Sequence, residues 1–69
     1  TYAQDLALDR FGRLVVSDSS GILLFDADGR FLRKFGIPGV AFDMQIDAQN
    51  RLWLATTNRR VLVYALPAP

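Results

Sequence analysis

An internal repeat constrains the fold of this chain more than any other feature of its sequence. The segment LALDRFGRLVVSD (6–18) returns in altered form as MQIDAQNRLWLAT (44–56), 38 positions later. After one inserted residue the match continues, because the apolar run 23–25 corresponds to 62–64. A period of 38 or 39 residues is close to the length of one β-propeller blade, which is a four-stranded antiparallel sheet. The repeat therefore predicts two similar sheet units.

Short apolar runs, rich in β-branched and aromatic residues, predict strands and no helix. The expected strands span residues 5–8, 13–17, 22–26, 31–35, 42–46, 52–55 and 61–65. Turn signals separate these runs, and the strongest is Asp28-Gly29, a pair typical of tight hairpins. Consecutive strands are therefore expected to pair antiparallel. The predicted fold class is all-β: one four-stranded propeller blade over residues 1–36, and a partial blade over 37–69 that lacks its outer strand.

Four of the runs are apolar at consecutive positions, whereas a sheet with one wet face alternates apolar and polar residues. These runs are 14–16, 22–25, 52–55 and 61–64. Because no helix is expected to cover them, each sheet is expected to pack against another sheet. Trp53, Phe42 and Tyr64 are accordingly predicted to lie in the core between blades. The run 30–35 mixes charged and apolar residues, as is typical of an outer edge strand.

The composition excludes several chemistries. The 69 residues include no Cys and no His, all seven acidic residues are Asp, and the net charge is +1. Disulfides, thiolate catalysis and the commonest general base are therefore absent. We expect no cofactor and no metal. The near-neutral charge argues against nucleic acid as the main partner. The longest apolar run has six residues (61–66), far fewer than a membrane span needs, so no membrane-spanning segment is expected.

Two blades cannot close a ring, since propellers have about four to eight. The chain is therefore expected either to be part of a longer propeller or to assemble with copies of itself, three copies giving six blades. Residues 1–4 of a neighbour, or an upstream segment, could supply the missing outer strand of the second unit. The expected partners are thus proteins: further blades, copies of the chain or a larger complex.

The segment DLALDRFGRLVVSDSSGILLFDADGRFLRKFG (5–36) resembles an NHL-type propeller repeat. It has an Asp before an apolar pair, D-x-x-G, an apolar strand, S/A-D and then F-D-x-D-G-x-F-L-x-x-F-G. The segment 43–66 resembles the repeat more loosely, and DAQNRLWLATT (47–57) is also similar to propeller repeats of two-component sensor proteins. The resemblance implies a propeller fold, and it favours an exported protein. It leaves the activity open, because NHL-like propellers include scaffolds, receptor ectodomains, RNA binders, lyases and lactonases.

Two loops and one turn supply the candidate binding residues. In propellers of this kind, the loops after the second strand of each unit lie on the face that usually binds partners. The candidates are Asp18, Ser19, Asn58, Arg59, Arg60 and Phe11. Adjacent guanidiniums at 59–60 can bind carboxylates or phosphates through paired hydrogen bonds. An aromatic residue in a turn, at position 11, is expected to anchor a neighbouring blade or to contact a partner. The alternative is that these are ordinary solvated turns.

Three further patterns are weaker. The run DADG (26–29) has the start of a calcium loop, but Arg30 and Ile37 stand where further oxygen ligands are needed, so a hairpin is favoured. Asp5 and Asp43 could face a central channel, where lactonase-like propellers carry metal ligands; alternatively they cap backbone amides. Serine catalysis is set aside because no activating base is present.

These observations favour a non-catalytic propeller segment that acts as a structural or protein-interaction scaffold. The alternative is a fragment of a lactonase- or lyase-like propeller enzyme whose catalytic residues lie outside this chain. NHL-type RNA binding is a third possibility, which the near-neutral charge disfavours.

Overall fold

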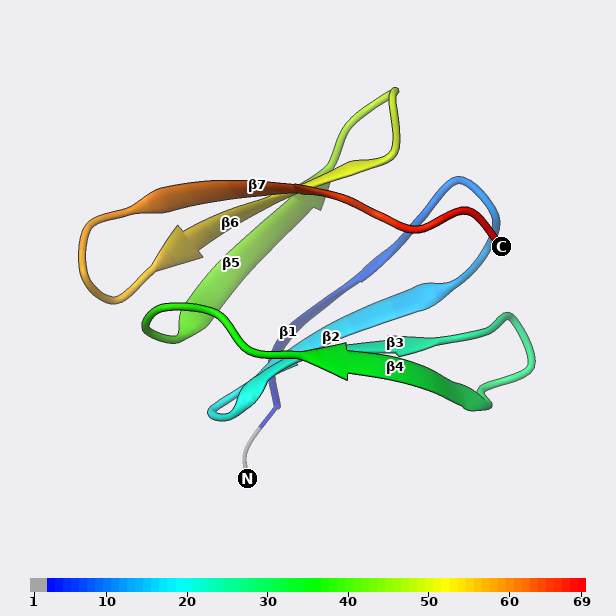
Figure 1. The fold of residues 1–69 in the computed structure, drawn as a ribbon, viewed down its shortest axis with the longest axis horizontal. Helices are drawn as coiled ribbons and strands as arrows, with labels where there is room; N and C mark the ends of the chain where they lie inside the picture. The colour runs from blue at the N-terminus through cyan, green and yellow to red at the C-terminus, as the bar shows by residue number, and fades with distance from the viewer. Residues whose placement is uncertain (1–2) are drawn as a thin grey trace.

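The computed structural model describes residues 3–69, which form seven β-strands and no helix (Figure 1). The strands are β1 (Ala3–Leu8), β2 (Leu14–Asp18), β3 (Gly21–Phe25), β4 (Phe31–Phe35), β5 (Ala41–Ile46), β6 (Arg51–Thr56) and β7 (Val61–Ala65). The all-β prediction is confirmed, and the bounds of every expected strand agree with the structure to within two residues.

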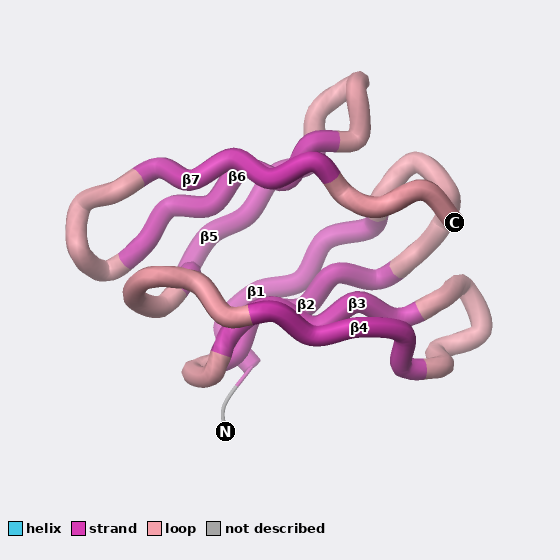
Figure 2. Tube along the Cα trace, in the orientation of Figure 1, coloured by secondary structure: helices cyan, strands magenta, loops and turns pink. Residues whose placement is uncertain are grey.

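The strands form two antiparallel sheets in which neighbours in sequence are neighbours in space. Sheet A has the order β1-β2-β3-β4, and sheet B has the order β5-β6-β7. The three-stranded sheet B fits the prediction that the second unit lacks its outer strand. The sheets lie face to face as two layers, and the first strands of the two sheets, β1 and β5, are neighbours (Figure 2).

One expectation about strand exchange is not met. Ala3 and Gln4 belong to β1, where Ala3 pairs with Asp18, so they extend the inner strand of their own sheet. They are therefore not left over to complete the edge of a neighbour's sheet. The rest of the predicted exchange segment, residues 1–2, lies outside the described residues.

Three of the hairpin turns share one set of hydrogen bonds. In each, an Asp accepts through Oδ1 from the backbone amides two and four residues later, at 2.8–3.0 Å. The residue three positions after that Asp has a left-handed backbone, which Gly and Asn adopt with least strain. These residues are Gly12 (φ 76°), Gly29 (φ 85°) and Asn50 (φ 61°). The D-x-x-G and D-x-x-N patterns thus fix the hairpins locally.

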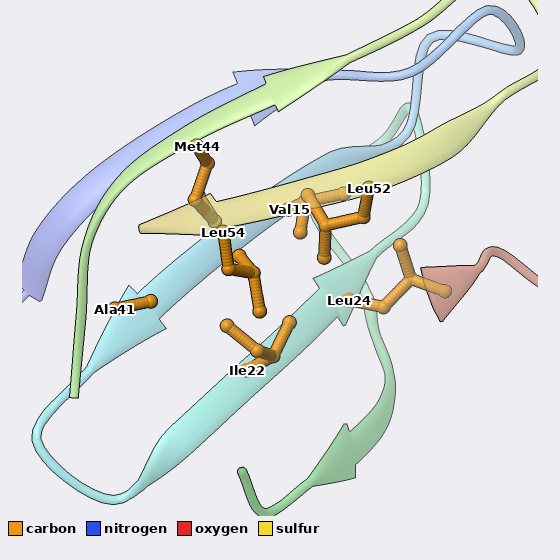
Figure 3. Packing of buried hydrophobic residues seen from close by; sticks show 7 residues of the cluster. All are labelled: Val15, Ile22, Leu24, Ala41, Met44, Leu52 and Leu54. Carbon is orange, nitrogen blue, oxygen red and sulfur yellow. The ribbon is translucent and has the colours of Figure 1, made fainter. Parts of the chain in front are cut away.

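The hydrophobic core lies between the two sheets. It consists of seven buried residues, and Figure 3 shows their side chains in the space between the layers: Val15, Ile22, Leu24, Ala41, Met44, Leu52 and Leu54. The first three come from sheet A and the others from sheet B. Towards the outer strands, the rings of Phe35 and Tyr64 pack with their centroids 5.4 Å apart. Each sheet therefore buries one of its two faces inside this chain.

Gly21 gives a test of this packing. Its φ is +143°, and a Cβ there would overlap the carbonyl oxygen of Phe35 on the neighbouring strand. We expect Gly21→Ala to lower the free energy of unfolding by about 2 kcal/mol, because both the backbone conformation and the space exclude a side chain. Urea unfolding measures the change.

Gly36→Ala is the matched control, because a Cβ at that position meets no heavy atom within 4 Å. Its effect should stay within about 0.5 kcal/mol. Equal losses at the two glycines would contradict the close approach of β3 and β4.

Candidate functional site

The structure divides the six predicted binding residues between two ends of the molecule. The β2–β3 loop, with Asp18 and Ser19, and the β6–β7 loop, residues 57–60, lie at one end (Figure 1). Phe11 lies in the β1–β2 turn at the other end. The loops can therefore contribute to one rim, and Phe11 belongs to a separate place.

Asp18, the last residue of β2, has a local structural role. Its Oδ1 accepts hydrogen bonds from the Ser20 amide at 2.8 Å and from the Ser20 hydroxyl at 2.7 Å. Only 9% of Asp18 is exposed. Ser19 between them is exposed. Asp18 thus holds its own tight turn, and Ser19 presents its side chain to solvent.

The β6–β7 loop departs from the other turns at two positions. Arg59 has a left-handed backbone, φ 63°, at the place where the other turns have Gly or Asn. Arg60 is the last residue of its loop, as Arg13, Arg30 and Arg51 are of their turns. Each of those three arginines follows an Asp by four residues, whereas Arg60 follows Thr56 by four residues.

In the other three turns, the Asp at the start of the turn forms an ion pair with the arginine at its end, with N–O distances of 2.7, 3.9 and 2.7 Å. The β6–β7 loop therefore exposes two adjacent guanidiniums and lacks the carboxylate that the equivalent turns provide. Such a pair can bind an external carboxylate or phosphate.

Phe11 is half exposed, and its ring lies 5.5 Å from the guanidinium carbons of both Arg10 and Arg13. These distances allow cation–π attraction. Phe11 thus packs over a buried arginine of its own chain, which gives this turn aromatic a role within the fold. Contact with a partner stays a prediction.

The sequence did not reveal a buried polar junction between the sheets. The Asp9 and Arg13 side chains are 0% and 5% exposed, and Arg13 Nε donates to Asp9 Oδ2 at 2.7 Å. Asn50 Nδ2, in the β5–β6 turn, also donates to Asp9 Oδ2, at 3.2 Å, and Arg13 Nη2 donates to the Pro67 carbonyl at 2.6 Å. The D-x-x-x-R spacing, present three times, was the available signal for the ion pair.

Opposing effects set the pKa of Asp9. Burial acts to raise it, but hydrogen bonds from Arg13, Asn50 and the Phe11 amide together lower the pKa below its ordinary value of 3.8. The carboxylate is therefore ionised at neutral pH and neutralises the buried arginine. This arrangement is structural, because its polar atoms are used in joining the two sheets.

Asp5 also joins the sheets. Its Oδ2 accepts a hydrogen bond from the Met44 amide of β5 at 2.9 Å. The equivalent Asp43 is exposed on sheet B, and its Oδ1 accepts from the same amide at 3.0 Å. Of the two readings of these residues, backbone capping fits the observed contacts.

Each sheet also has an outer face, which points away from the core. The outer face of sheet A exposes Leu6 (62%) and Leu8 (66%), and the outer face of sheet B exposes Val61 (67%), Val63 (43%) and Trp53 (39%). A shallow hollow of about 170 Å³ lies on the outer face of sheet B, beside Asp43, Trp53 and Val61. Both outer faces therefore present large apolar side chains to solvent.

Two of the three aromatic residues predicted to lie in the core are not there. Phe42 is 54% exposed, and Trp53 is on the outer face of sheet B, where its Nε1 donates to Asp47 Oδ2 at 2.8 Å. This hydrogen bond, with those from Arg51, holds the pKa of Asp47 well below its ordinary value. Tyr64 is half-buried against the core, as predicted.

Comparison of the chain with protein-family models, with curated proteins and with solved structures finds no match. The similarity to NHL repeats therefore stays a prediction from the sequence. Within residues 3–69, no cluster of three or more His, Cys, Asp or Glu side chains is suited to hold a metal ion. The same residues include no helix long and apolar enough to cross a membrane. Fold and surface together define two stacked antiparallel sheets that resemble propeller blades.

The buried junction can be tested with a pair of equivalent substitutions. We expect Asp9→Ala to lower the free energy of unfolding by about 3 kcal/mol, because it leaves the buried Arg13 guanidinium without its counter-charge. Asp47→Ala removes the same turn hydrogen bonds from an ion pair whose side chains are 48% and 22% exposed, so its effect should be much smaller. Urea unfolding of both variants gives the difference. Similar losses would show that the turn bonds, and not the buried pair, dominate.

Arg59 offers a second test. We expect Arg59→Gly to raise the free energy of unfolding by about 1 kcal/mol, because glycine adopts the left-handed backbone without strain. Arg60→Gly, which removes the same charge at a residue without a left-handed backbone, should not stabilise the chain. Thermal unfolding of both variants measures this. A destabilised Arg59→Gly would mean that the side chain contributes contacts that outweigh its backbone strain.

Proposed function

We propose that this chain is a non-catalytic β-propeller segment whose role is to bind other protein surfaces and to build a larger assembly. The observation that carries this proposal is the exposure of large apolar side chains on the outer faces of both sheets. Leu6, Leu8 and Val61 each expose more than 60% of their surface. Contiguous apolar patches of this kind mark interaction sites in soluble proteins.

The mode of binding follows from the way the chain already packs. Its two sheets bury one face each against the other, with close-packed Leu, Ile, Val and Met side chains. Burying apolar surface stabilises by about 25 cal/mol per Å², so a second sheet on either outer face gains free energy in the same way. A protein that presents a flat apolar sheet is therefore the partner these faces fit best.

The polar loops give such an assembly a second kind of contact. Asn58, Arg59 and Arg60 are exposed in the β6–β7 loop, and the β2–β3 loop, which contains the exposed Ser19, lies at the same end of the molecule (Figure 1). The two guanidiniums are suited to acidic groups of a partner. We propose that this rim adds selectivity while the sheet faces supply most of the buried area.

Sedimentation of the full chain tests the proposal. We expect the protein to sediment as species larger than its 7.7 kDa mass, with association that strengthens as concentration rises. A 7.7 kDa monomer with a β-sheet circular dichroism spectrum at every accessible concentration would contradict binding through the outer faces. Elemental analysis of the associated protein is the companion measurement, because retained calcium or zinc would favour the lactonase-like alternative instead.

A further inference from the structure

The 38-residue repeat relates the outer face of sheet A to the inner face of sheet B. In sheet A, Leu6 pairs with Val16, which pairs with Leu23; in sheet B, the equivalent Met44 pairs with Leu54, which pairs with Leu62. The outer face of sheet A contains Leu6, Leu8, Leu14 and Val16 at the positions of Met44, Ile46, Leu52 and Leu54. Those four residues of sheet B pack in or against the core. The outer face of sheet A therefore resembles the inner face of sheet B, which is the face that packs against sheet A.

The converse holds for the outer face of sheet B. It contains Asp43, Trp53, Ala55 and Val63 at the positions of Asp5, Val15, Ser17 and Leu24. The last three of those are buried in the interface with sheet B, and Asp5 hydrogen-bonds across it. The two outer faces of one chain are therefore equivalent, by the repeat, to the two inner faces that already pack against each other.

The hydrogen bond across the interface has an equivalent at these faces. Both inner strands have a bulge at the same place, between Ala3 and Asp5 in β1 and between Ala41 and Asp43 in β5. In β5 the bulge brings the Met44 amide to the Asp5 carboxylate at 2.9 Å. The Leu6 amide is the equivalent donor on sheet A, and the Asp43 carboxylate is the equivalent acceptor on sheet B.

We propose that a second copy of this chain binds head to tail, with the outer face of sheet B of one copy on the outer face of sheet A of the next. This inference rests on the proposed function and specifies the partner. In the interface between copies, the Asp43 carboxylate accepts a hydrogen bond from the Leu6 amide of the next copy. The contact uses different surfaces on the two copies, so each added copy presents a further face, and the assembly forms a ring if the rotation between copies closes and a filament if it does not.

The differences between the two repeats are compatible with this interface. Within the chain, the side-chain amide of Asn50 donates to Asp9. The residue at the equivalent position of sheet A is Gly12, which has no side chain. Gly12 of one copy therefore offers no such donor to Asp47 of the preceding copy. Asp47 is instead satisfied by Trp53 Nε1 at 2.8 Å and by Arg51 Nε at 2.7 Å. The hollow beside Asp43 and Trp53 is the proposed place for the Leu6 side chain of the next copy, because the equivalent Met44 packs in the core between the sheets.

Two blocking substitutions test the head-to-tail contact. Leu6→Lys places a charge on the outer face of sheet A, and Val63→Lys places one on the outer face of sheet B; these residues are 62% and 43% exposed, so the fold should tolerate both. Each variant alone should sediment as a monomer, because each lacks one half of the interface. An equimolar mixture should form a 1:1 dimer, in which the intact sheet B of Leu6→Lys binds the intact sheet A of Val63→Lys.

Other outcomes overturn the proposal in distinguishable ways. If either variant alone forms dimers, or if the wild type associates while the mixture stays monomeric, the faces do not bind head to tail although the chain binds through them. If the wild type is also monomeric, the proposed function fails as well. Should either variant lose its β-sheet spectrum, Leu8→Lys and Val61→Lys, at residues 66% and 67% exposed, replace them in the same experiment.

Asp43 tests the predicted hydrogen bond. Asp43→Ala should weaken association of the otherwise wild-type chain about tenfold, because the carboxylate no longer accepts the Leu6 amide of the next copy. Asp28→Ala removes the same charge from the exposed β3–β4 turn and should leave association unchanged. Equal effects of the two substitutions would assign the change to net charge and would overturn the role of Asp43.

Discussion

The structure depends on one constraint: its strands are apolar on both faces, and each sheet can cover only one of them with the other sheet. The covered faces form a core in which Val15, Ile22 and Leu52 are fully buried. The uncovered faces have the same character and remain in water. A chain of this length buries only about 60% of the surface that its unfolded form exposes, so the free energy of folding is small. Covering an outer face would therefore stabilise the fold as well as join two molecules.

Local chemistry determines the strand pairing, and long-range polar contacts determine how the sheets meet. An Asp at the start of a turn binds two amides and leaves the fourth position to a residue with a left-handed backbone, as at Gly12 and Gly29. These hydrogen bonds form between residues of the same turn. The contacts from Asp5 to Met44 and from Asn50 to Asp9 instead join residues about 40 positions apart and fix the relative position of the sheets.

This division explains how much of the structure could be predicted from the sequence. Strands and turns follow from patterns within a few residues, so their bounds and the all-β class could be predicted closely. The polar junction around Arg13 could not, because its hydrogen-bond partners include the carbonyl of Pro67, which lies 54 positions away. The exposure of Trp53 has a related cause. Its position repeats that of buried Val15, but no sheet formed by residues 3–69 packs on the outer face of sheet B.

Two of the three D-x-x-x-R copies show how the surroundings change the role of the same residue types. Asp9 and Arg13 lie between the sheets, where water is excluded and each hydrogen-bond partner must come from protein. Asp47 and Arg51 have the same N–O distance of 2.7 Å but lie at an outer face, where solvent screens the pair. The sequence difference that accompanies this is small: a tryptophan replaces a valine and supplies Asp47 with a donor. A sheet stacked on that outer face would exclude water from the second pair, and its environment would then approach that of the first.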